Sequence, residues 1–155
     1  MADKKEPILI AADHYGLLLK DPIREYLIEK GYEVKDLGVN SDEPVLYPEI
    51  ALNLALEVKK FNYSRGILVC GTGIGMAMVA NKVPGIRAAV IHDPYSAERS
   101  RASNDAQIAA LGSLVIGVNA AKKMIDIWLD SEFGGGRSLP KVQMIKDLDE
   151  KRWVK

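Results

Sequence analysis

The sequence predicts an α/β protein in which helices cover both faces of a parallel sheet. Two observations support this prediction. Short apolar runs that suit buried strands alternate with longer segments whose apolar residues recur at helical spacing. Polar residues or glycines directly follow several of these runs, at the strand ends where parallel sheets bind ligands. The 155 residues are enough for one domain with a full core.

The expected strands are residues 7–12, 32–37, 67–70, 86–91 and 114–117, with 106–111 as a short strand or an extended turn. These runs are short and mostly apolar, as strands covered on both faces are. The run Ile67-Leu68-Val69-Cys70 is the clearest, because Gly66 and Gly71 bound it on either side.

The expected helices lie between the strands, at about 22–30, 48–61, 74–82, 95–103, 119–131 and 139–151. Asp21-Pro22 and Asp93-Pro94 each match an N-cap followed by proline at the first helical position. Gly31 is a typical stop for the first helix. Strands alternating with helices of this length favour a parallel sheet over an antiparallel one.

The composition is that of an ordinary globular protein. Lys+Arg and Asp+Glu number 21 each, so the formal net charge of zero does not favour a nucleic-acid partner. The single cysteine, Cys70, cannot form an internal disulfide, which favours a reducing compartment. No run approaches the roughly 18 apolar residues of a membrane span. The start of the chain lacks the long apolar region of a signal peptide, so the cytoplasm is the expected location.

Three candidate ligand-binding segments stand at the carboxyl ends of expected strands. They are Asp13-His14, the glycine-rich turn from Cys70 to Gly75, and His92-Asp93. Glycines allow backbone N–H groups to approach a ligand closely, and the helix after the turn favours an anion at the same point. Cys70 is therefore a candidate reactive thiol, although a lone cysteine ending an apolar strand is more often a small core residue.

The glycine-rich turn matches neither common nucleotide motif. In a G-x-G-x-x-G fingerprint begun at Gly71 or Gly73, the last glycine would be Met76 or Met78. The phosphate-loop pattern also fails, because Lys82 lies far down the following helix. These failures count against a small nucleotide-binding signalling domain.

The segment CGTGIGMAMVANKVPGIRAA closely resembles the type B ribose-5-phosphate isomerases and their relatives, the allose- and galactose-6-phosphate isomerases. AADHYG, SNDAQ and FGGGR followed by Lys141 match further family positions. The resemblance implies a single isomerase domain over 1–155, a Rossmann-like three-layer sandwich with a five-stranded, mostly parallel sheet. It also implies a homodimer or tetramer with the active site near the subunit interface, where the helix at 139–151 packs on the partner. The implied reaction is aldose–ketose isomerisation of a sugar phosphate through an enediol, without metal or cofactor.

The resemblance also implies a role for each matching residue. Cys70 matches the base that moves a proton between carbons 1 and 2, and Thr72 matches a residue that handles the substrate oxygens. The other implied substrate-binding positions are Asp13, His14, Gly71, Gly73, Ile74, Gly75, Ser103 and Asn104, with Arg137 and Lys141 at the phosphate.

Three departures from the family pattern bear on the substrate. Ser103 stands where a ring-opening histidine is common, Leu114 replaces an arginine, and Ser138 replaces a histidine. HDPYSAER together with SND looks more like a branch that acts on erythrose 4-phosphate, whose O4 ester cannot close a furanose ring. The tetrose phosphate is therefore the first expectation. Ribose 5-phosphate and a role as a hexose 6-phosphate isomerase subunit are the alternatives.

Several residues have a simpler structural interpretation. Thr72 is equally suited to capping the turn. His92-Asp93 is expected to cap the next helix rather than to contact the ligand. Arg87, Arg99 and Arg101 are expected to be surface or interface charges. A non-catalytic phosphosugar-binding subunit is a further alternative, against which the presence of Cys70 counts.

Overall fold

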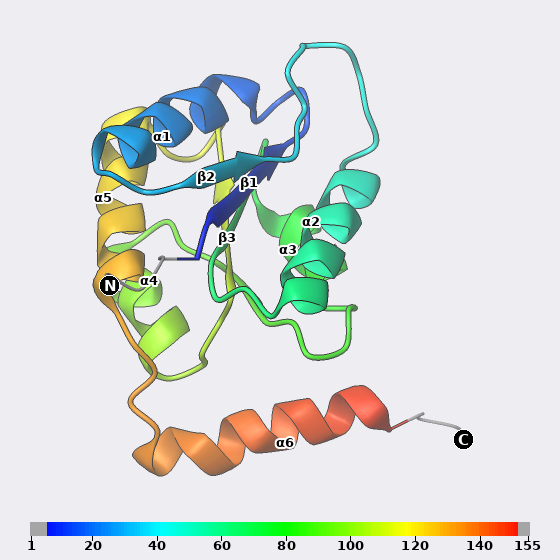
Figure 1. Cartoon of the computed structure of the whole chain (residues 1–155), viewed down its shortest axis with the longest axis vertical. Helices are drawn as coiled ribbons and strands as arrows, with labels where there is room; N and C mark the ends of the chain where they lie inside the picture. Colours follow the sequence, from blue (N-terminus) through cyan, green and yellow to red (C-terminus); the bar gives the residue numbers. More distant parts are fainter. Residues whose placement is uncertain (1–5, 152–155) are drawn as a thin grey trace.

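The centre of the molecule is a five-stranded sheet in which every pair of neighbouring strands runs parallel, in the order β2-β1-β3-β5-β4 (Figure 1). The strands are β1 (Ile8–Ala12), β2 (Val34–Asp36), β3 (Gly66–Cys70), β4 (Ala88–Val90) and β5 (Ile108–Gly112). The structure is a computed structural model that describes residues 6–151. Residues 1–5 lie outside this range. They belong to the start of the chain, where no signal peptide is expected.

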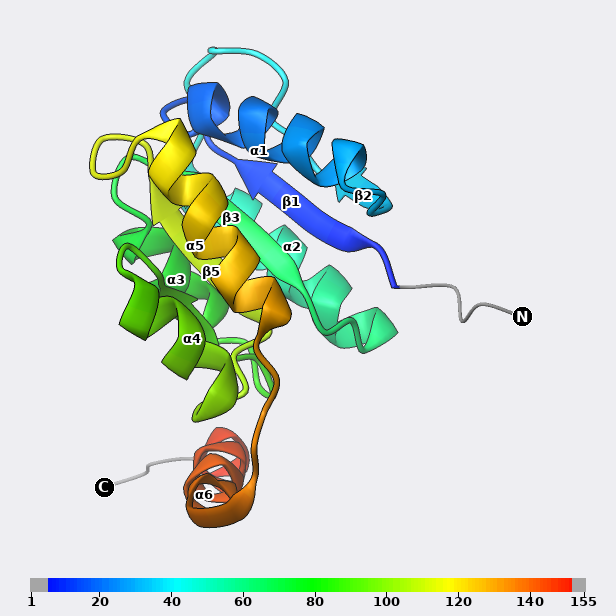
Figure 2. The ribbon, with the colours of Figure 1, turned by 90° about the vertical axis from the view of Figure 1, so that its left-hand side faces the viewer.

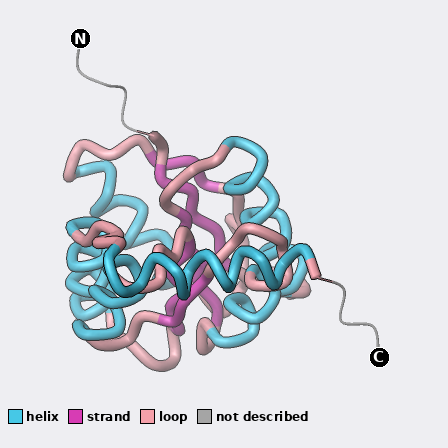
Figure 3. The backbone as a smooth tube through the Cα atoms, turned by 90° about the horizontal axis from the view of Figure 1, so that it is seen from below, coloured by secondary structure: helices cyan, strands magenta, loops and turns pink. Residues whose placement is uncertain are grey.

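Helices cover both faces of the sheet, as Figure 3 shows from the side of its amino edge, so the predicted three-layer α/β sandwich is confirmed. One face packs against α1 (Leu17–Glu29), α4 (Pro94–Ala102) and α5 (Val118–Asp130), and the other against α2 (Tyr47–Phe61) and α3 (Ile74–Ala80). A short 3₁₀ turn, η1 (Gly136–Ser138), leads into α6 (Leu139–Glu150). In Figures 1 and 3, α6 crosses the amino edge of the sheet.

The alternation of buried strand residues explains the two-sided core. Ile8 and Ile10 of β1 pack toward α1 and α5, whereas Leu9 and Ala11 pack toward α2 and α3. Trp128 of α5 is fully buried on the first side. Since burying one large apolar side chain contributes about 1.5–3 kcal/mol, the two apolar layers are the main source of stability. Among the described helices, none is long and apolar enough to cross a membrane.

The expected fifth strand at 114–117 is wrong. This segment is a turn in which Leu114 and Val115 are exposed, while the strand is Ile108–Gly112, within and just beyond the segment given as a short strand or extended turn. β5 lies between β3 and β4 with helices on both faces, so small alanines at 109 and 110 fit there despite their modest strand propensity. Tertiary packing outweighed the β-branched composition of the later run.

The start of the first helix is also corrected. Helix α1 begins at Leu17, and Pro22 lies inside it rather than at its first position. A proline inside a helix removes one i→i−4 hydrogen bond and is costly, and the apolar contacts of α1 with the sheet offset that cost. The extra turn buries Leu19 and Lys20 completely or nearly so. Elsewhere the strands at 34–36 and 88–90 are shorter than expected because they are the edges of the sheet, and the helix boundaries agree within a few residues.

Candidate active site

The strand order places two of the three candidate segments side by side. β1 and β3 are neighbours, so Asp13-His14 at the end of β1 lies next to the glycine-rich turn at the end of β3. A cavity of about 900 Å³ opens between them, lined by Asp13, His14, Cys70, Gly71, Thr72, Ile74 and Gly75 among others. The predicted convergence at the carboxyl edge of the sheet is confirmed for these segments.

The turn after β3 holds the cysteine sulfur against a backbone donor. Cys70 is only 5% exposed, and its Sγ accepts the Gly73 N–H at 3.0 Å. Gly73 has a φ of 76°, and a Cβ there would lie 3.0 Å from the Leu111 backbone, so only glycine suits this position. The Ile74 N–H donates to the Thr72 Oγ1 at 3.3 Å. Thr72 therefore caps the turn and also faces the cavity, so both interpretations of it stand.

Asp13 and His14 are oriented by different backbone groups. The buried Asp13 carboxylate accepts the Gly16 N–H at 3.0 Å and so closes the turn before α1. The Val45 N–H donates to the Nδ1 of His14 at 3.2 Å. Because Nδ1 accepts this bond, the proton of the neutral imidazole resides on Nε2. No group of three His, Cys, Asp or Glu side chains within residues 6–151 is arranged to hold a metal ion.

The end of the connection between β2 and α2, together with the first residue of α2, forms a wall of the cavity that no motif in the sequence singled out. Val45, Leu46 and Tyr47 line it, and the Tyr47 ring lies over Gly75, where an added Cβ would come within 2.6 Å of the ring. The run of three apolar residues immediately before Pro48 was the signal that could have revealed this wall.

A buried ion pair anchors the same connection. The Nζ of Lys20, which is fully buried, donates to both carboxylate oxygens of Asp36, at 3.0 and 2.8 Å, and to the Val39 carbonyl at 2.7 Å. Burial alone would raise the pKa of Asp36, but bonds from Lys20, the Gly38 N–H and Arg24 outweigh it and lower the pKa. The start of the connection is therefore tied to α1.

His92, in the third candidate segment, supports the glycine-rich turn indirectly, through the end of β5. Its Nε2 accepts the Gly112 N–H at 2.8 Å, and burial lowers its pKa below the usual range. A Cβ on Gly112 would lie 2.6 Å from the Cα of Thr72, and the Ser113 N–H donates to the Cys70 carbonyl at 2.8 Å. Asp93 caps α4 as expected, accepting the Ser96 N–H at 2.8 Å.

We expect the pKa of His92 to make stability depend on pH. The folded state binds fewer protons than the unfolded state wherever His92 is neutral in the former and charged in the latter. The free energy of unfolding should therefore fall as pH drops below about 6.5 and level off below the folded pKa. Urea unfolding of the wild type and His92→Gln between pH 7.5 and 5 measures this. The chain has one other histidine, so equal pH slopes in both proteins would contradict the assignment.

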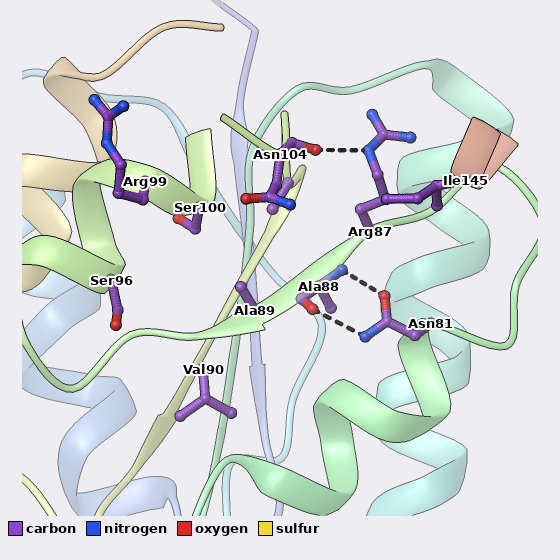
Figure 4. Close-up of a pocket in the computed structure, with 11 residues that line it drawn as sticks. Asn81, Arg87, Ala88, Ala89, Val90, Ser96, Arg99, Ser100, Asn104 and Ile145 are labelled. Carbon is purple, nitrogen blue, oxygen red and sulfur yellow. Dashed lines mark hydrogen bonds between the residues drawn. The ribbon is translucent and has the colours of Figure 1, made fainter. Parts of the chain in front are cut away.

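The remaining predicted residues lie at the opposite edge of the sheet. Ser103 and Asn104 precede β5, whose last residue, Gly112, pairs with Cys70. Helix α6 lies near this amino edge (Figures 1 and 2). It carries Lys141, and the η1 turn directly before it carries Arg137; both side chains are exposed. A second cavity of about 410 Å³ lies here, lined by Asn104 and, from α6, by Ile145 (Figure 4). One chain therefore does not bring Ser103, Asn104, Arg137 and Lys141 to the Cys70 pocket.

Two of the three arginines expected at the surface are buried. Arg87 and Arg101 are each 7% exposed, whereas Arg99 is half-buried and its Nη1 donates to the Ser103 Oγ at 3.3 Å. Burial, with Arg65 nearby, lowers the pKa of Arg101 to about 10. The expectation failed because these side chains satisfy carbonyl groups around the loop before β5, which no spacing in the sequence reveals.

The chain matches the family described as Ribose/Galactose Isomerase over residues 8–145. It is 55% identical over 144 residues to ribose-5-P isomerase B of Listeria innocua, covering 93% of this chain and 97% of that protein. It is 52% identical over 139 residues to D-erythrulose-4-phosphate isomerase of Pectobacterium atrosepticum, covering 89% and 91%. Ribose-5-phosphate isomerase B of Clostridium thermocellum superposes with a TM-score of 0.91 at 46% identity, covering 94% and 98%.

These matches span nearly the whole chain in both sequence and fold, and they confirm the resemblance found in the motifs. The pocket with Cys70 and the glycine-rich turn lies inside the matched region. The chain therefore belongs to the ribose/galactose isomerase family, and it is an aldose–ketose isomerase of a sugar phosphate.

Proposed function

We propose that Cys70 is the base that moves a proton between carbons 2 and 1 of an open-chain aldose phosphate. The position of Cys70 supports this role: the residue lines the carboxyl-edge pocket, and its sulfur accepts the Gly73 N–H at 3.0 Å. The thiolate is the form of a cysteine that can accept a proton. The family's implied mechanism assigns the same role to the matching cysteine.

In this mechanism the thiolate removes the proton on carbon 2. The electrons of that C–H bond form the double bond between carbons 1 and 2, and the aldehyde oxygen takes the negative charge. The thiol then returns the proton to carbon 1, while a proton passes from the hydroxyl on carbon 2 to the oxygen on carbon 1. Thr72 is the group we assign to this second transfer, because it lines the pocket beside Cys70 and carries a hydroxyl. Backbone N–H groups of the turn stabilise the charged oxygen.

We propose erythrose 4-phosphate as the substrate and erythrulose 4-phosphate as the product. Its O4 carries the phosphate, so the sugar cannot close a furanose ring and needs no ring-opening acid. Ser103 supplies no imidazole, and Leu114 presents an apolar side chain to the pocket where an arginine is common. The relative from Pectobacterium atrosepticum, named for the four-carbon sugar, supports this choice. Ribose 5-phosphate is the alternative, supported by the name of the Listeria innocua relative.

Turnover of the two sugar phosphates decides between them. We expect kcat/KM for erythrose 4-phosphate to exceed that for ribose 5-phosphate. Ser103→His should raise ribose 5-phosphate turnover by about 10-fold or more by supplying a ring-opening acid or base, with little effect on the tetrose. Ser103→Asn is the matched control, since it adds a polar side chain without a titratable group. Faster turnover of ribose 5-phosphate by the wild type would contradict the tetrose assignment.

We also propose that a second copy of this chain completes the site, as a homodimer or a pair of dimers. Its Ser103, Asn104, Arg137 and Lys141 would meet the Cys70 pocket, with α6 packing on the partner. Exposed large apolar side chains around that pocket support the proposal, because such clusters mark interaction surfaces. They are Tyr15, Leu46, Ile74, Met78 and Leu114. We place the activity in the cytoplasm, where the thiol of Cys70 stays reduced.

A further inference from the structure

The Arg87 side chain hydrogen-bonds to the loop that carries Asn104. Its guanidinium is buried, and its Nε donates to the Asn104 carbonyl at 2.9 Å, as Figure 4 shows. Its Nη2 donates to the Asp105 carbonyl at 2.9 Å and to the Asp105 carboxylate at 3.3 Å. Both carbonyls follow the end of α4, where the backbone acceptors have left the helix and need other partners.

The loop at Asn104 and Asp105 has a backbone conformation that requires support. Asp105 has a φ of 49°, in the left-handed region that non-glycine residues seldom adopt. Arg87 is itself anchored, because its N–H donates to the Gln107 Oε1 at 2.8 Å, and the Gln107 Nε2 donates to the Gly85 carbonyl at 2.8 Å. The guanidinium thus joins the start of β4 rigidly to the loop before β5.

The same loop directs the Asn104 side chain into the second cavity. In Figure 4 the Asn104 carbonyl faces Arg87, whereas its side-chain amide points over Ala89 into the cavity. Asn104 is exposed, so its amide is available to a ligand or to a second copy of the chain. Because the planar guanidinium bonds two successive carbonyls, it sets the direction of the peptide groups on both sides of Asp105.

We propose that Arg87 is a positioning residue for the isomerisation, which aims the Asn104 amide at the substrate by holding the Asn104–Asp105 backbone. The inference rests on the proposed role of Asn104 in substrate binding. Arg87 itself touches no substrate in this proposal and acts only through the loop. A displacement of about 1 Å in a substrate-positioning group can cost about 10²-fold in rate, so the loss of the Arg87 hydrogen bonds to the loop should have a measurable effect.

A double-mutant cycle between Arg87 and Asn104 tests the proposal. Arg87→Gln is expected to lower kcat/KM by about 10- to 100-fold in the wild-type background and by less than about 2-fold in the Asn104→Ala background. Arg87→Lys should recover part of the loss, since an ammonium can bond one carbonyl but not both. Asn81→Ala is the matched control. It also removes two side-chain bonds to backbone at this cavity, at Ala88, and should keep kcat/KM within about 2-fold.

Equal losses in both backgrounds, or no loss in either, would overturn the positioning role, because a merely structural defect does not depend on the Asn104 side chain. If Arg87→Gln fails to fold, the same cycle with Arg87→Lys gives the answer. Wild-type activity of Asn104→Ala would remove Asn104 from the site and this inference with it, while leaving the role of Cys70 to its own test.

Discussion

Replacing Cys70 with alanine is expected to lower kcat/KM for the sugar phosphate by about 10²- to 10⁴-fold, the usual value of a positioned base. The sulfur lies against the Gly73 N–H at the pocket and is the only thiol in the chain, so no other cysteine can substitute for it. The kinetics should be measured with incorporation of solvent deuterium at carbons 1 and 2. This exchange reports the enediol step directly and should disappear together with turnover.

Thermal unfolding separates loss of chemistry from loss of fold. Cys70 is nearly buried in the apolar layer beside α2 and α3, so alanine, which is slightly smaller, should leave the protein folded. Cys70→Ser keeps the size of the side chain and replaces the thiol with a far weaker acid, so it should be similarly inactive. Near-normal turnover by either folded variant would exclude Cys70 as the base.

Mixing two inactive variants is expected to restore activity. Cys70→Ala damages the carboxyl edge, whereas the double variant Asn104→Ala, Arg137→Ala damages the amino edge. If each site joins the carboxyl edge of one copy to the amino edge of another, a mixed dimer has one intact site of its two. After unfolding and refolding the variants together in equal amounts, about a quarter of the wild-type activity should return.

The control mixture combines Cys70→Ala with Thr72→Ala, which damage the same edge. Every site in a mixed dimer then keeps one defect, and no activity should return. Sedimentation of the mixtures checks that the copies associate. Associated mixtures without any recovery of activity would contradict the shared site and would leave Asn104 and Arg137 without a route to the Cys70 pocket.

Local patterns determined most of the core and half of the site. An apolar run bounded by glycines predicts the buried strand β3, the glycine-rich turn and the helix after it. The structure explains one of these glycines, since Gly73 has a positive φ and lies against the Leu111 backbone. The proximity of His14 to Cys70 followed as well, since the carboxyl ends of parallel strands share one edge. The motifs around these residues are also specific enough to indicate the family from the sequence alone.

Only the tertiary structure decided the rest, because it depends on which segments pack together. The identity of β5 was settled by the space between two helical layers, which admits alanines and leaves Leu114 outside. The direction of β5 places Asn104 at the far edge from Cys70, so the implied residues divide into two sets. Arg87 resembled a surface charge in sequence, and only the carbonyls of the loop before β5 explain its burial.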